Sequence, residues 1–365
     1  MSEEHLRWMR LAISLGERGL GRVWPNPAVG SVIVKEGRVL GRGWTGNGGR
    51  PHAETQALAG AGQAARGATA YVSLEPCAHH GQTPPCAAAL IDAGVARVVT
   101  AIEDPDPRVA GRGHALLRQA GIEVVTGVLA EAARHAQAGF LSRITRGRPL
   151  LTLKLATSLD GRIATAAGES RWITGPEARR LVHALRARHD AVLIGAGTAR
   201  ADNPALTVRG LGIAAQPLRI AASRALDLPV AGKLAQSARQ VPLWLLHGPE
   251  APAAAREAWQ ALGARLFEIP LSAAAALDPA AMLAALGQAG LTRVFCEGGG
   301  AFAAALLRAG LVDRLALFTA GLALGGEARP ALGGLGLDRL AAAPRFELIE
   351  TRPIGGDCFQ LWQAR

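Results

Sequence analysis

The sequence predicts an α/β protein built from two domains. The chain has 365 residues, well above the roughly 150 residues of a typical single domain. Hydrophobic residues make up 49% of it and charged residues 19%, which is enough apolar material for more than one core. Short apolar runs typical of strands alternate with stretches of helical periodicity in both halves. A basic segment with Gly and Pro, residues 143–149, reads as a linker, so we expect domains over 1–146 and 147–365.

The first half is expected to form a three-layer sandwich whose later strands are parallel. Apolar positions at helical spacing predict a helix over 5–18. An apolar run over 29–34, bounded by Pro-Asn-Pro and Lys-Glu-Gly, predicts a strand that leads into a hairpin with 39–44. The other expected elements are helices over 52–61, 85–93 and 115–120, and strands over 70–74, 97–101 and 123–126.

The second half begins with an expected strand over 150–156, directly after the linker. A helix is expected over the Ala-rich residues 254–262, and another directly after a Gly-Gly-Gly turn near the end of the chain. Further strands are expected over 191–194, 218–222, 241–246, 265–268, 293–296 and 315–319.

Charge and composition exclude several classes of protein. The net charge of +11 suits an enzyme of anionic small molecules and does not by itself indicate nucleic acid. Seven Trp, seven Phe and one Tyr are few for a protein that stacks single-stranded bases. No apolar stretch is long enough to span a membrane, the first residues do not resemble a secretion signal, and four cysteines are no disulfide framework. We therefore expect a cytoplasmic protein without membrane or nucleic-acid partners.

The most specific motif predicts a catalytic zinc site in the first half. His52, Cys77 and Cys86 supply one imidazole and two thiolates, and three such ligands leave a fourth position of zinc open for water. Glu54 lies two residues after His52, where it can take a proton from that water and pass it to leaving ammonia. This is the pattern of a hydrolytic base deaminase.

Two other interpretations of these residues remain open at this point. Eight residues separate Cys77 from Cys86, whereas the common deaminase motif has two. A fourth ligand, His79 or His80, would make the zinc site structural and Glu54 incidental. The cysteines could also be inert core residues.

The second half carries a weaker signal for a nucleotide. The expected strand over 293–296 runs into Glu297-Gly298-Gly299-Gly300 and then a helix, an arrangement that can bind a phosphate. A tight left-handed connection would explain the glycines equally well. The turn does not match G-x-G-x-x-G and does not open the domain, so a Rossmann fold is not indicated.

Taken together, the ordered motifs resemble those of the bifunctional deaminase–reductases of riboflavin biosynthesis. The resemblance covers essentially the whole chain, and the long Cys–Cys spacing with His-His-Gly distinguishes this family from other deaminases. The motifs are Pro25-Asn26-Pro27, His52-Ala53-Glu54, Ser73–Gly81, Thr83–Cys86 and Glu103–Pro107 in the first half, and Leu153–Arg162, Ser170–Thr174, Gly195–Pro204, Leu206–Arg209 and Glu297–Phe302 in the second.

The resemblance implies a cytidine-deaminase-like domain followed by a dihydrofolate-reductase-like domain. The first would use Zn²⁺ to deaminate 2,5-diamino-6-ribosylamino-4(3H)-pyrimidinone 5′-phosphate. The second would use NADPH to reduce the ribosyl group of the resulting 5-amino-6-(5-phosphoribosylamino)uracil to ribityl. It further implies that His52, Cys77 and Cys86 hold the zinc and that Glu54 is catalytic. The alternative function is a nucleic-acid base deaminase with an unrelated appended domain.

The resemblance also implies sets of contact residues. The implied substrate contacts are Asn26, His79 and Asp104 in the first half, and Ser170, Arg186, Leu206, Arg209 and Glu297 in the second. The implied NADPH contacts are Ala156, Trp172, Thr198, Asp202, Ser223, Gly299, Gly300, Ala301, Phe302, Ala303, Ala304 and Ala305. Arginine suits a phosphate because its guanidinium binds two oxygens at once, although either one could instead be an exposed surface charge.

Some positions in the motifs leave the prediction open. Trp172 could equally be a core aromatic, and Lys154 and Asp202 are both candidate proton donors for the reduction. Gln82 stands where the family usually has Lys or Arg, and Asp106 where Asn is common, so local substrate contacts are uncertain there. We also expect the protein to form a homo-oligomer.

Overall fold

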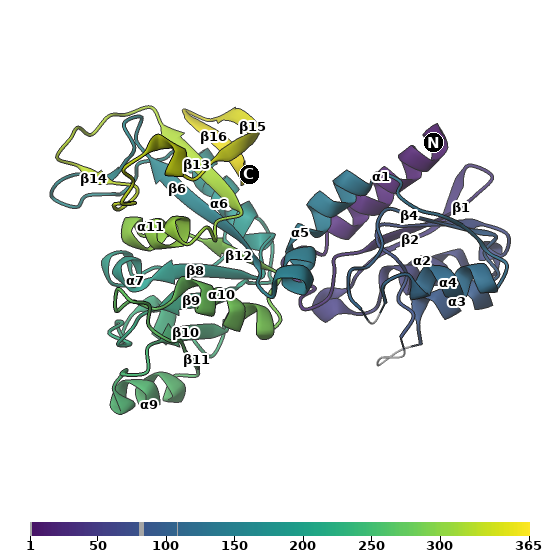
Figure 1. Ribbon diagram of the computed structural model, residues 1–365, viewed down its shortest axis with the longest axis horizontal. Coiled ribbons are helices and arrows are strands. Elements are labelled where there is room, and N and C mark those ends of the chain that lie inside the picture. The colour runs from purple at the N-terminus through teal and green to yellow at the C-terminus, as the bar shows by residue number, and fades with distance from the viewer. Residues whose placement is uncertain (1, 80–83, 108) are drawn as a thin grey trace. The chain divides into compact units, whose positions relative to one another are not determined.

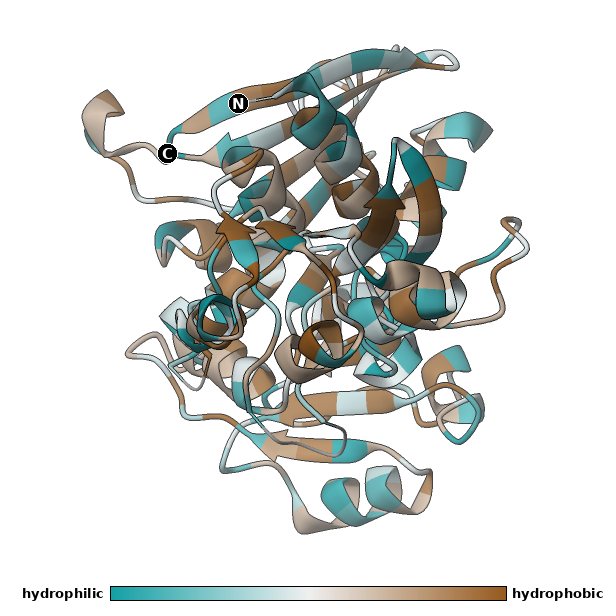
Figure 2. Cartoon of the chain, turned by 90° about the vertical axis from the view of Figure 1, so that its right-hand side faces the viewer, coloured by the Kyte–Doolittle hydropathy of each residue, from teal (hydrophilic) through white to brown (hydrophobic). Residues whose placement is uncertain are grey.

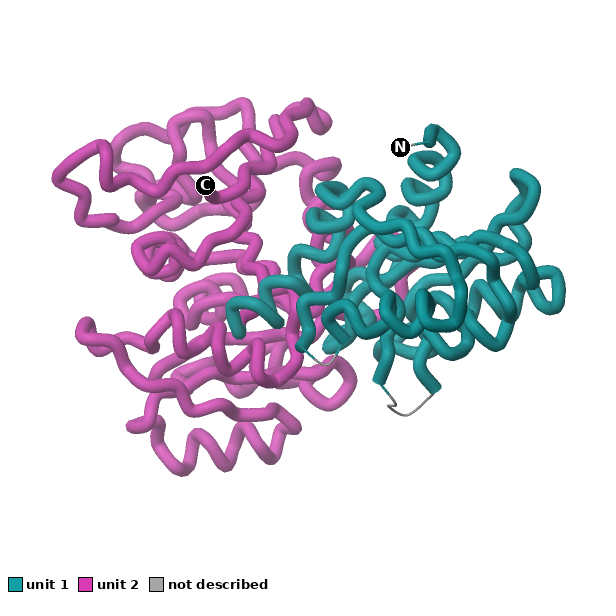
Figure 3. Tube along the Cα trace, turned by 45° about the vertical axis from the view of Figure 1, so that its right-hand side comes forward, with its two compact units in different colours: residues 1–147 teal, residues 148–365 magenta. Residues whose placement is uncertain are grey.

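The structure, a computed structural model, describes residues 2–79, 84–107 and 109–365. It divides into two compact units, Met1–Gly147 and Arg148–Arg365 (Figure 3). Each unit has its own sheet and its own hydrophobic cores. Among the described residues, no helix is both long and apolar enough to cross a bilayer.

Unit 1 is built on a five-stranded sheet with the order β2-β1-β3-β4-β5 (Figure 1). The first hairpin is antiparallel, β1 also pairs antiparallel with β3, and the remaining pairs are parallel. The strands are β1 (Gly30–Lys35), β2 (Arg38–Trp44), β3 (Thr69–Val72), β4 (Arg97–Thr100) and β5 (Glu123–Val125).

Helices cover both faces of this sheet, as the first half predicts. One core joins α1 and α5 to β1, β3 and β4, and the other joins α2, α3 and α4 to the opposite face. The helices are α1 (Glu3–Glu17), α2 (Ala53–Ala61), α3 (Cys86–Asp92), α4 (Arg112–Gln119) and α5 (Ala130–Arg146), with short 3₁₀ turns η1 (Asn47–Gly49) and η2 (Gly62–Ala65). The three-layer prediction is confirmed.

Unit 2 is built on a nine-stranded sheet with the order β11-β10-β9-β8-β12-β6-β13-β16-β15. Strands from β11 to β13 in that order are parallel, and the last two pairs are antiparallel. The strands are β6 (Leu150–Thr157), β8 (Ala191–Gly195), β9 (Leu218–Ala222), β10 (Leu243–His247), β11 (Arg265–Glu268), β12 (Arg293–Cys296), β13 (Arg314–Ala320), β15 (Phe346–Ile354) and β16 (Asp357–Ala364), and β7 (Arg162–Ala164) pairs separately with β14 (Arg329–Pro330).

Four of the parallel strands of unit 2, β8, β9, β10 and β12, are buried at every position, as expected where helices cover both faces of a sheet. Figure 2 colours the whole chain by hydropathy, and brown, hydrophobic segments occur along many of its strands. The helices are α6 (Pro176–Ala187), α7 (Ala196–Asp202), α8 (Lys233–Gln236), α9 (Ala253–Ala261), α10 (Pro279–Gln288) and α11 (Gly300–Arg308), with the 3₁₀ turn η3 (Leu340–Ala342).

The structure corrects the linker prediction. Residues 143–146 are the last turn of α5, a helix that the basic composition concealed, and Gly147 ends it in a left-handed conformation. The connection to β6 is therefore much shorter than the expected 143–149 segment. Helices α6, α7 and α10 and the β15–β16 hairpin were also not anticipated from the sequence.

Candidate functional site

Four segments of unit 1 meet at one edge of its sheet. The register pairs Gly30 with Trp44, and Ser31 with Val72, which in turn pairs with Thr100. The start of β1 and the ends of β2, β3 and β4 therefore share this edge. The predicted site residues lie in the loops at this edge and in the first turns of the helices that follow them: Asn26, His52, Glu54, Cys77, His79, Cys86 and Asp104.

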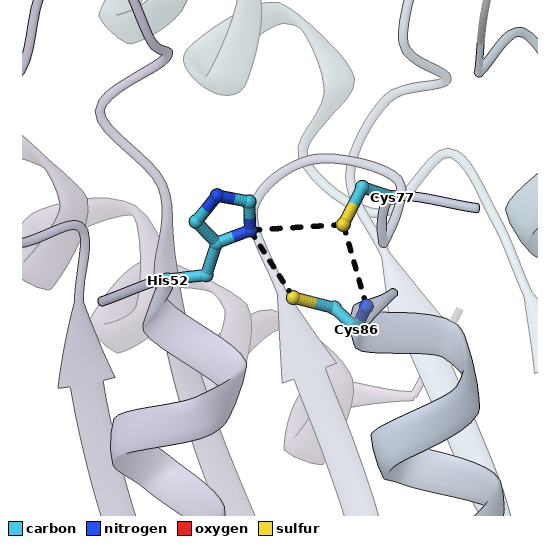
Figure 4. Close-up of side chains that lie close together, drawn as sticks. All are labelled: His52, Cys77 and Cys86. Carbon is cyan, nitrogen blue, oxygen red and sulfur yellow. Dashed lines mark hydrogen bonds between the residues drawn. The ribbon is translucent and has the colours of Figure 1, made fainter. Parts of the chain in front are cut away.

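The three predicted zinc ligands lie together at this edge (Figure 4). His52 caps α2, Cys86 opens α3, and Cys77 lies in the loop after β3. The Nδ1 atom of His52 is 3.2 Å from Sγ of Cys86 and 3.6 Å from Sγ of Cys77 (Figure 4). One nitrogen and two sulfurs within 4.8 Å of one another are a donor set that suits zinc. Within the described part of the chain, that group contains no fourth His, Cys, Asp or Glu; His80 lies outside it.

The electrostatics of the cluster fit a metal site. The backbone N–H of Cys86 donates to Sγ of Cys77 over 3.3 Å. Hydrogen bonds from Cys86 and His52 outweigh burial and lower the pKa of Cys77 to about 4, so this sulfur is a thiolate. The Cys86 thiol, whose pKa is raised by sharing a proton with Cys77 and by burial, is the weaker acid of the pair.

Glu54 is buried beside these ligands. Glu54 is 4% exposed, and its side chain is hydrogen-bonded to the side chain of Cys86. Burial and the Cys77 charge raise the pKa of Glu54 to about 7, so near neutral pH it can both accept and release a proton. If Cys77 and Cys86 were inert core residues, the burial of a carboxyl group against them would have no explanation.

The other residues implied for the first half lie around the same edge. Asn26 donates its side-chain amide to the carbonyl oxygen of Gly49 over 3.1 Å. His79 has a buried Nδ1 atom without a hydrogen-bond partner among the described residues, and Asp104 is buried after β4. Gln82, whose substitution left substrate contacts uncertain, lies outside the described residues.

The predicted residues of unit 2 gather at the carboxyl ends of four neighbouring strands, β9, β8, β12 and β6. Ser223 follows β9, Thr198 lies on the helix after β8, and Glu297 follows β12. Ala156 lies on β6. The carboxyl ends of parallel strands are where open α/β sheets bind their ligands.

The Gly-Gly-Gly turn packs against Thr198 of α7 at the start of α11, and we call the site formed by Thr198, Gly298 and Gly299 the cradle. Gly299 caps α11 with a positive φ of 91°, and a Cβ atom there would lie 3.0 Å from Oγ1 of Thr198. Thr198 donates to the carbonyl oxygen of Gly298 over 3.2 Å. The amino-terminal turns of α7 and α11 therefore lie close together, and helix amino termini favour a phosphate group.

A buried ion pair lies beside this cradle. The Arg186 guanidinium donates to both carboxylate oxygens of Glu297, one of them over 2.8 Å, and to the carbonyl oxygen of Thr207 over 2.8 Å. Burial opposes the charge of Glu297, but Arg186 and Lys154 outweigh it and hold the pKa of Glu297 below its usual value. Glu297 and Thr207 thus occupy the guanidinium of Arg186, whereas Arg209 is exposed and donates to the hydroxyl of Thr207 over 3.4 Å.

Lys154 interacts electrostatically with both members of the Arg186–Glu297 ion pair. Desolvation lowers its pKa, while the charges of Glu297 and Asp202 oppose the shift. The two candidate proton donors, Lys154 and Asp202, thus interact electrostatically although 48 positions separate them in the sequence.

Trp172 is not a core aromatic, because the residue is 69% exposed. The Arg179 guanidinium lies 4.7 Å from the centre of its ring. Asp202 ends α7 and accepts a hydrogen bond at its carbonyl oxygen from the neighbouring Arg171. Ser170 is half-buried two residues before Trp172, so this partly exposed stretch of chain contacts the carboxyl end of α7.

Comparison with known proteins decides the family. Residues 149–359 match the RibD C-terminal domain, and residues 2–102 match the cytidine and deoxycytidylate deaminase zinc-binding region. The riboflavin biosynthesis protein RibD of Escherichia coli is 43% identical over 99% of both chains, and that of Bacillus amyloliquefaciens is 38% identical over 96% of this chain and 94% of its own. The chain belongs to the RibD family.

Solved structures of the family agree over the full length. Acinetobacter baumannii RibD is 38% identical, with a TM-score of 0.90 over 100% of this chain and 99% of its own. A diaminohydroxyphosphoribosylaminopyrimidine deaminase/5-amino-6-(5-phosphoribosylamino)uracil reductase of Thermotoga maritima is 32% identical, with a TM-score of 0.86 over 99% of both chains.

Membership confirms the predicted fold class and activity. The protein is a bifunctional deaminase and reductase of riboflavin biosynthesis, with a cytidine-deaminase-like zinc-binding region followed by a dihydrofolate-reductase-like domain that uses NADPH. The alternative of an unrelated appended domain is wrong, because the second half matches the RibD reductase.

Proposed function

We propose that residues 1–146 deaminate 2,5-diamino-6-ribosylamino-4(3H)-pyrimidinone 5′-phosphate and that residues 147–365 reduce the product. The observation that carries the first assignment is the burial of Glu54 against a His-Cys-Cys cluster. His52, Cys77 and Cys86 would hold the zinc, and Asn26, His79 and Asp104 would contact the pyrimidine substrate. The relative from Thermotoga maritima is named for these two activities.

In the deaminase, Glu54 would move the proton. When bound, zinc supplies the Lewis acidity that makes water a nucleophile near neutral pH. With a pKa of about 7, Glu54 would accept a proton from the attacking water and release it to the leaving ammonia nitrogen. Burial keeps bulk water from competing for this proton.

Replacing the carboxylate tests this role. Glu54→Gln keeps the size of the side chain but cannot accept the proton, so ammonia release should fall by about 10²- to 10⁴-fold. Zinc content should stay at the wild-type level because His52, Cys77 and Cys86 remain. If ammonia release is unchanged while zinc is bound, the site is structural and the assignment is wrong.

In the reductase, the cradle between α7 and α11 would hold the NADPH phosphates. Thr198, Gly299 and the following residues to Ala305 would contact the cofactor, together with Ala156, Trp172, Asp202 and Ser223. NADPH supplies the hydride, and the protein orients it toward the sugar carbon and excludes water. The Arg186–Glu297 pair would border the sugar, with Ser170 and Leu206 beside it, and Arg209 would bind the substrate phosphate.

A charge-neutral change at Arg209 tests the phosphate contact. Arg209→Gln should raise the KM for 5-amino-6-(5-phosphoribosylamino)uracil by about tenfold or more, because a hydrogen bond to a charged group contributes about 1.5–3 kcal/mol. The KM for NADPH should not change. An equal rise in both KM values would contradict a contact specific to the substrate.

We also propose that the chain forms a homo-oligomer in the cytoplasm. The four cysteines are free thiols, which fits a reducing compartment. Strand β15 lies at the edge of the unit 2 sheet and is mostly exposed, including Leu348 and Ile349 at 43% and 46%. An edge strand of this length presents unpaired backbone N–H and C=O groups with which a second copy can pair. Sedimentation of the wild type and of Ile349→Lys tests this, and a monomeric wild type would contradict it.

A further inference from the structure

The carboxylate of Glu75 lies at the centre of a backbone network in unit 1 that no motif analysis indicated. Its side chain is 0% exposed. Oε2 accepts the N–H groups of Asp104 over 3.2 Å and Gly111 over 3.0 Å. Oε1 accepts those of Gly113 over 2.9 Å and His114 over 3.2 Å. A carboxylate is the side chain that can accept four such bonds, because it offers two oxygens and no donor.

These bonds join three segments that are distant in sequence. Glu75 lies two residues before Cys77, and its own N–H donates to the carbonyl oxygen of Ile102 over 3.0 Å. Asp104 lies in the loop after β4, and Gly113 and His114 lie in the first turn of α4. The bonded N–H groups include the first ones of α4, which favour a negative charge.

Packing leaves little freedom around the network. A Cβ atom at Gly113 would lie 2.0 Å from the carbonyl oxygen of Pro76 and 3.2 Å from Oε1 of Glu75. The first turn of α4 therefore packs directly on the Glu75-Pro76 backbone. Asp104, held through its N–H, uses its Oδ1 atom to accept the N–H of Asp106 over 2.9 Å.

We propose that Glu75 is a positioning residue of the deaminase, which holds Asp104 at a set place relative to the His52-Cys77-Cys86 cluster. Glu75 has no place in the proton transfer; it acts through the backbone at Asp104. The inference rests on the proposed function, in which Asp104 contacts the pyrimidine substrate. Small displacements of such a contact are costly because the substrate must meet Asp104 and the reacting centre together.

The decisive change is Glu75→Gln, which replaces one acceptor oxygen by an NH₂ group facing two backbone donors. The KM for the diaminopyrimidine phosphate should rise by about 10- to 100-fold, the usual effect of losing a supporting residue. Zinc content and reduction of the uracil derivative by NADPH should stay at wild-type levels. The exposed Glu123, paired with Arg97 over 2.7 Å on the same unit, gives the matched control Glu123→Gln, which should change nothing.

A double-mutant cycle with Asp104→Asn separates positioning from general loss of structure. If Glu75 acts through Asp104, the double variant should have the KM of Asp104→Asn alone, because the two changes remove the same interaction. Additive effects would overturn the inference, as would an unchanged KM for Glu75→Gln. Loss of zinc together with deamination, with reduction retained, would show a structural role in the metal region and would also overturn it.

The cycle also distinguishes this inference from the proposed function. An unchanged KM for Asp104→Asn would remove the proposed substrate contact and, with it, the role of Glu75. A raised KM for Asp104→Asn with a normal Glu75→Gln would leave the contact standing and overturn only the inference. Should Glu75→Gln fail to fold, Glu75→Asp, which keeps both oxygens, is measured by the same criteria, and its failure to fold would count as a structural role.

Discussion

At the scale of single residues, unit 2 contains a histidine whose protonation should govern acid stability. His189 is 6% exposed, and its Nδ1–H donates to the carbonyl oxygen of Leu185 over 2.7 Å. Its Nε2 atom is 3.0 Å from the Thr152 hydroxyl and accepts a hydrogen bond in the neutral ring. Desolvation lowers the pKa of His189 to about 3, so the folded protein keeps the ring neutral in mild acid.

The free energy of unfolding should therefore decrease as the pH falls below about 6.5, the pKa of histidine in the unfolded chain. Below this pH the ring is protonated in the unfolded chain but stays neutral in the folded one. His189 alone should contribute a slope approaching about 1.4 kcal/mol per pH unit between roughly pH 6 and its folded pKa. In denaturant titrations at pH 7.5, 6.5, 5.5 and 4.5, His189→Gln should be less stable at pH 7.5 but lose less stability in acid. Equal slopes for both proteins would contradict the prediction.

The sequence predicted single residues well where chemistry depends on local spacing. His52 and Glu54 are two positions apart at the start of one helix, and the Pro-Cys junctions mark turns, so these residues were found without a structure. Glu75 lies within the Ser73–Gly81 motif, but the sequence did not predict it as a site residue. Its partners are backbone N–H groups 29 to 39 positions away, which have no residue type to recognise.

At the scale of elements, two glycines of β2 allow α2 to approach the sheet. A Cβ atom at Gly41 would lie 2.0 Å from the carbonyl oxygen of Ala57, and one at Gly43 would lie 2.4 Å from that of Ala53. Backbone atoms cannot yield as side chains do. The glycines thus determine where the first turn of α2, with His52 and Glu54, lies against the strand.

Gly43→Ala should displace that turn, and we expect it to lower the stability by about 1–3 kcal/mol, as overpacking of a core does. Deamination should fall and reduction should persist, because the change lies in unit 1. Gly60→Ala is the matched control on α2 itself, since its Cβ would make an ordinary 3.4 Å contact. It should be neutral or stabilising by about 0.5–1 kcal/mol. Thermal unfolding measures the change in stability, and assays of deamination and reduction measure the two activities. Deamination at the wild-type rate in Gly43→Ala would contradict the prediction.

Most elements with strong apolar runs were predicted within a few residues, including β9, β11 and β12. Helix α5 was not, because its basic last turn resembles a linker and its apolar side packs on α1 and the sheet. Helix α6 carries four Arg and His residues among twelve, and its apolar side chains pack chiefly against β13 and β16. Tertiary packing stabilises such helices more than their intrinsic propensity does.

At the scale of the whole molecule, two units with separate cores should carry separable activities. Cys77→Ser removes a thiolate from the zinc donor set and should abolish ammonia release. NADPH oxidation on supplied 5-amino-6-(5-phosphoribosylamino)uracil should stay at the wild-type rate, because unit 2 holds the reductase residues. Cys358→Ser, a half-buried thiol on β16, is the control and should leave both activities intact. Loss of both activities in a folded Cys77→Ser protein would contradict the assignment of one activity to each unit.

The sequence by itself determined the chemistry of the first site: a nitrogen and two sulfurs for zinc, and a neighbouring carboxyl group. These features depend on residue type and short spacing, which are visible in one dimension. The tertiary structure alone decided that Arg186 pairs with Glu297 and that Trp172 is exposed. It also decided that the buried carboxylate of Glu75 joins the loop of Cys77 to Asp104. Each of these depends on which strands become neighbours, and that follows from burial of the whole apolar surface, which no local pattern contains.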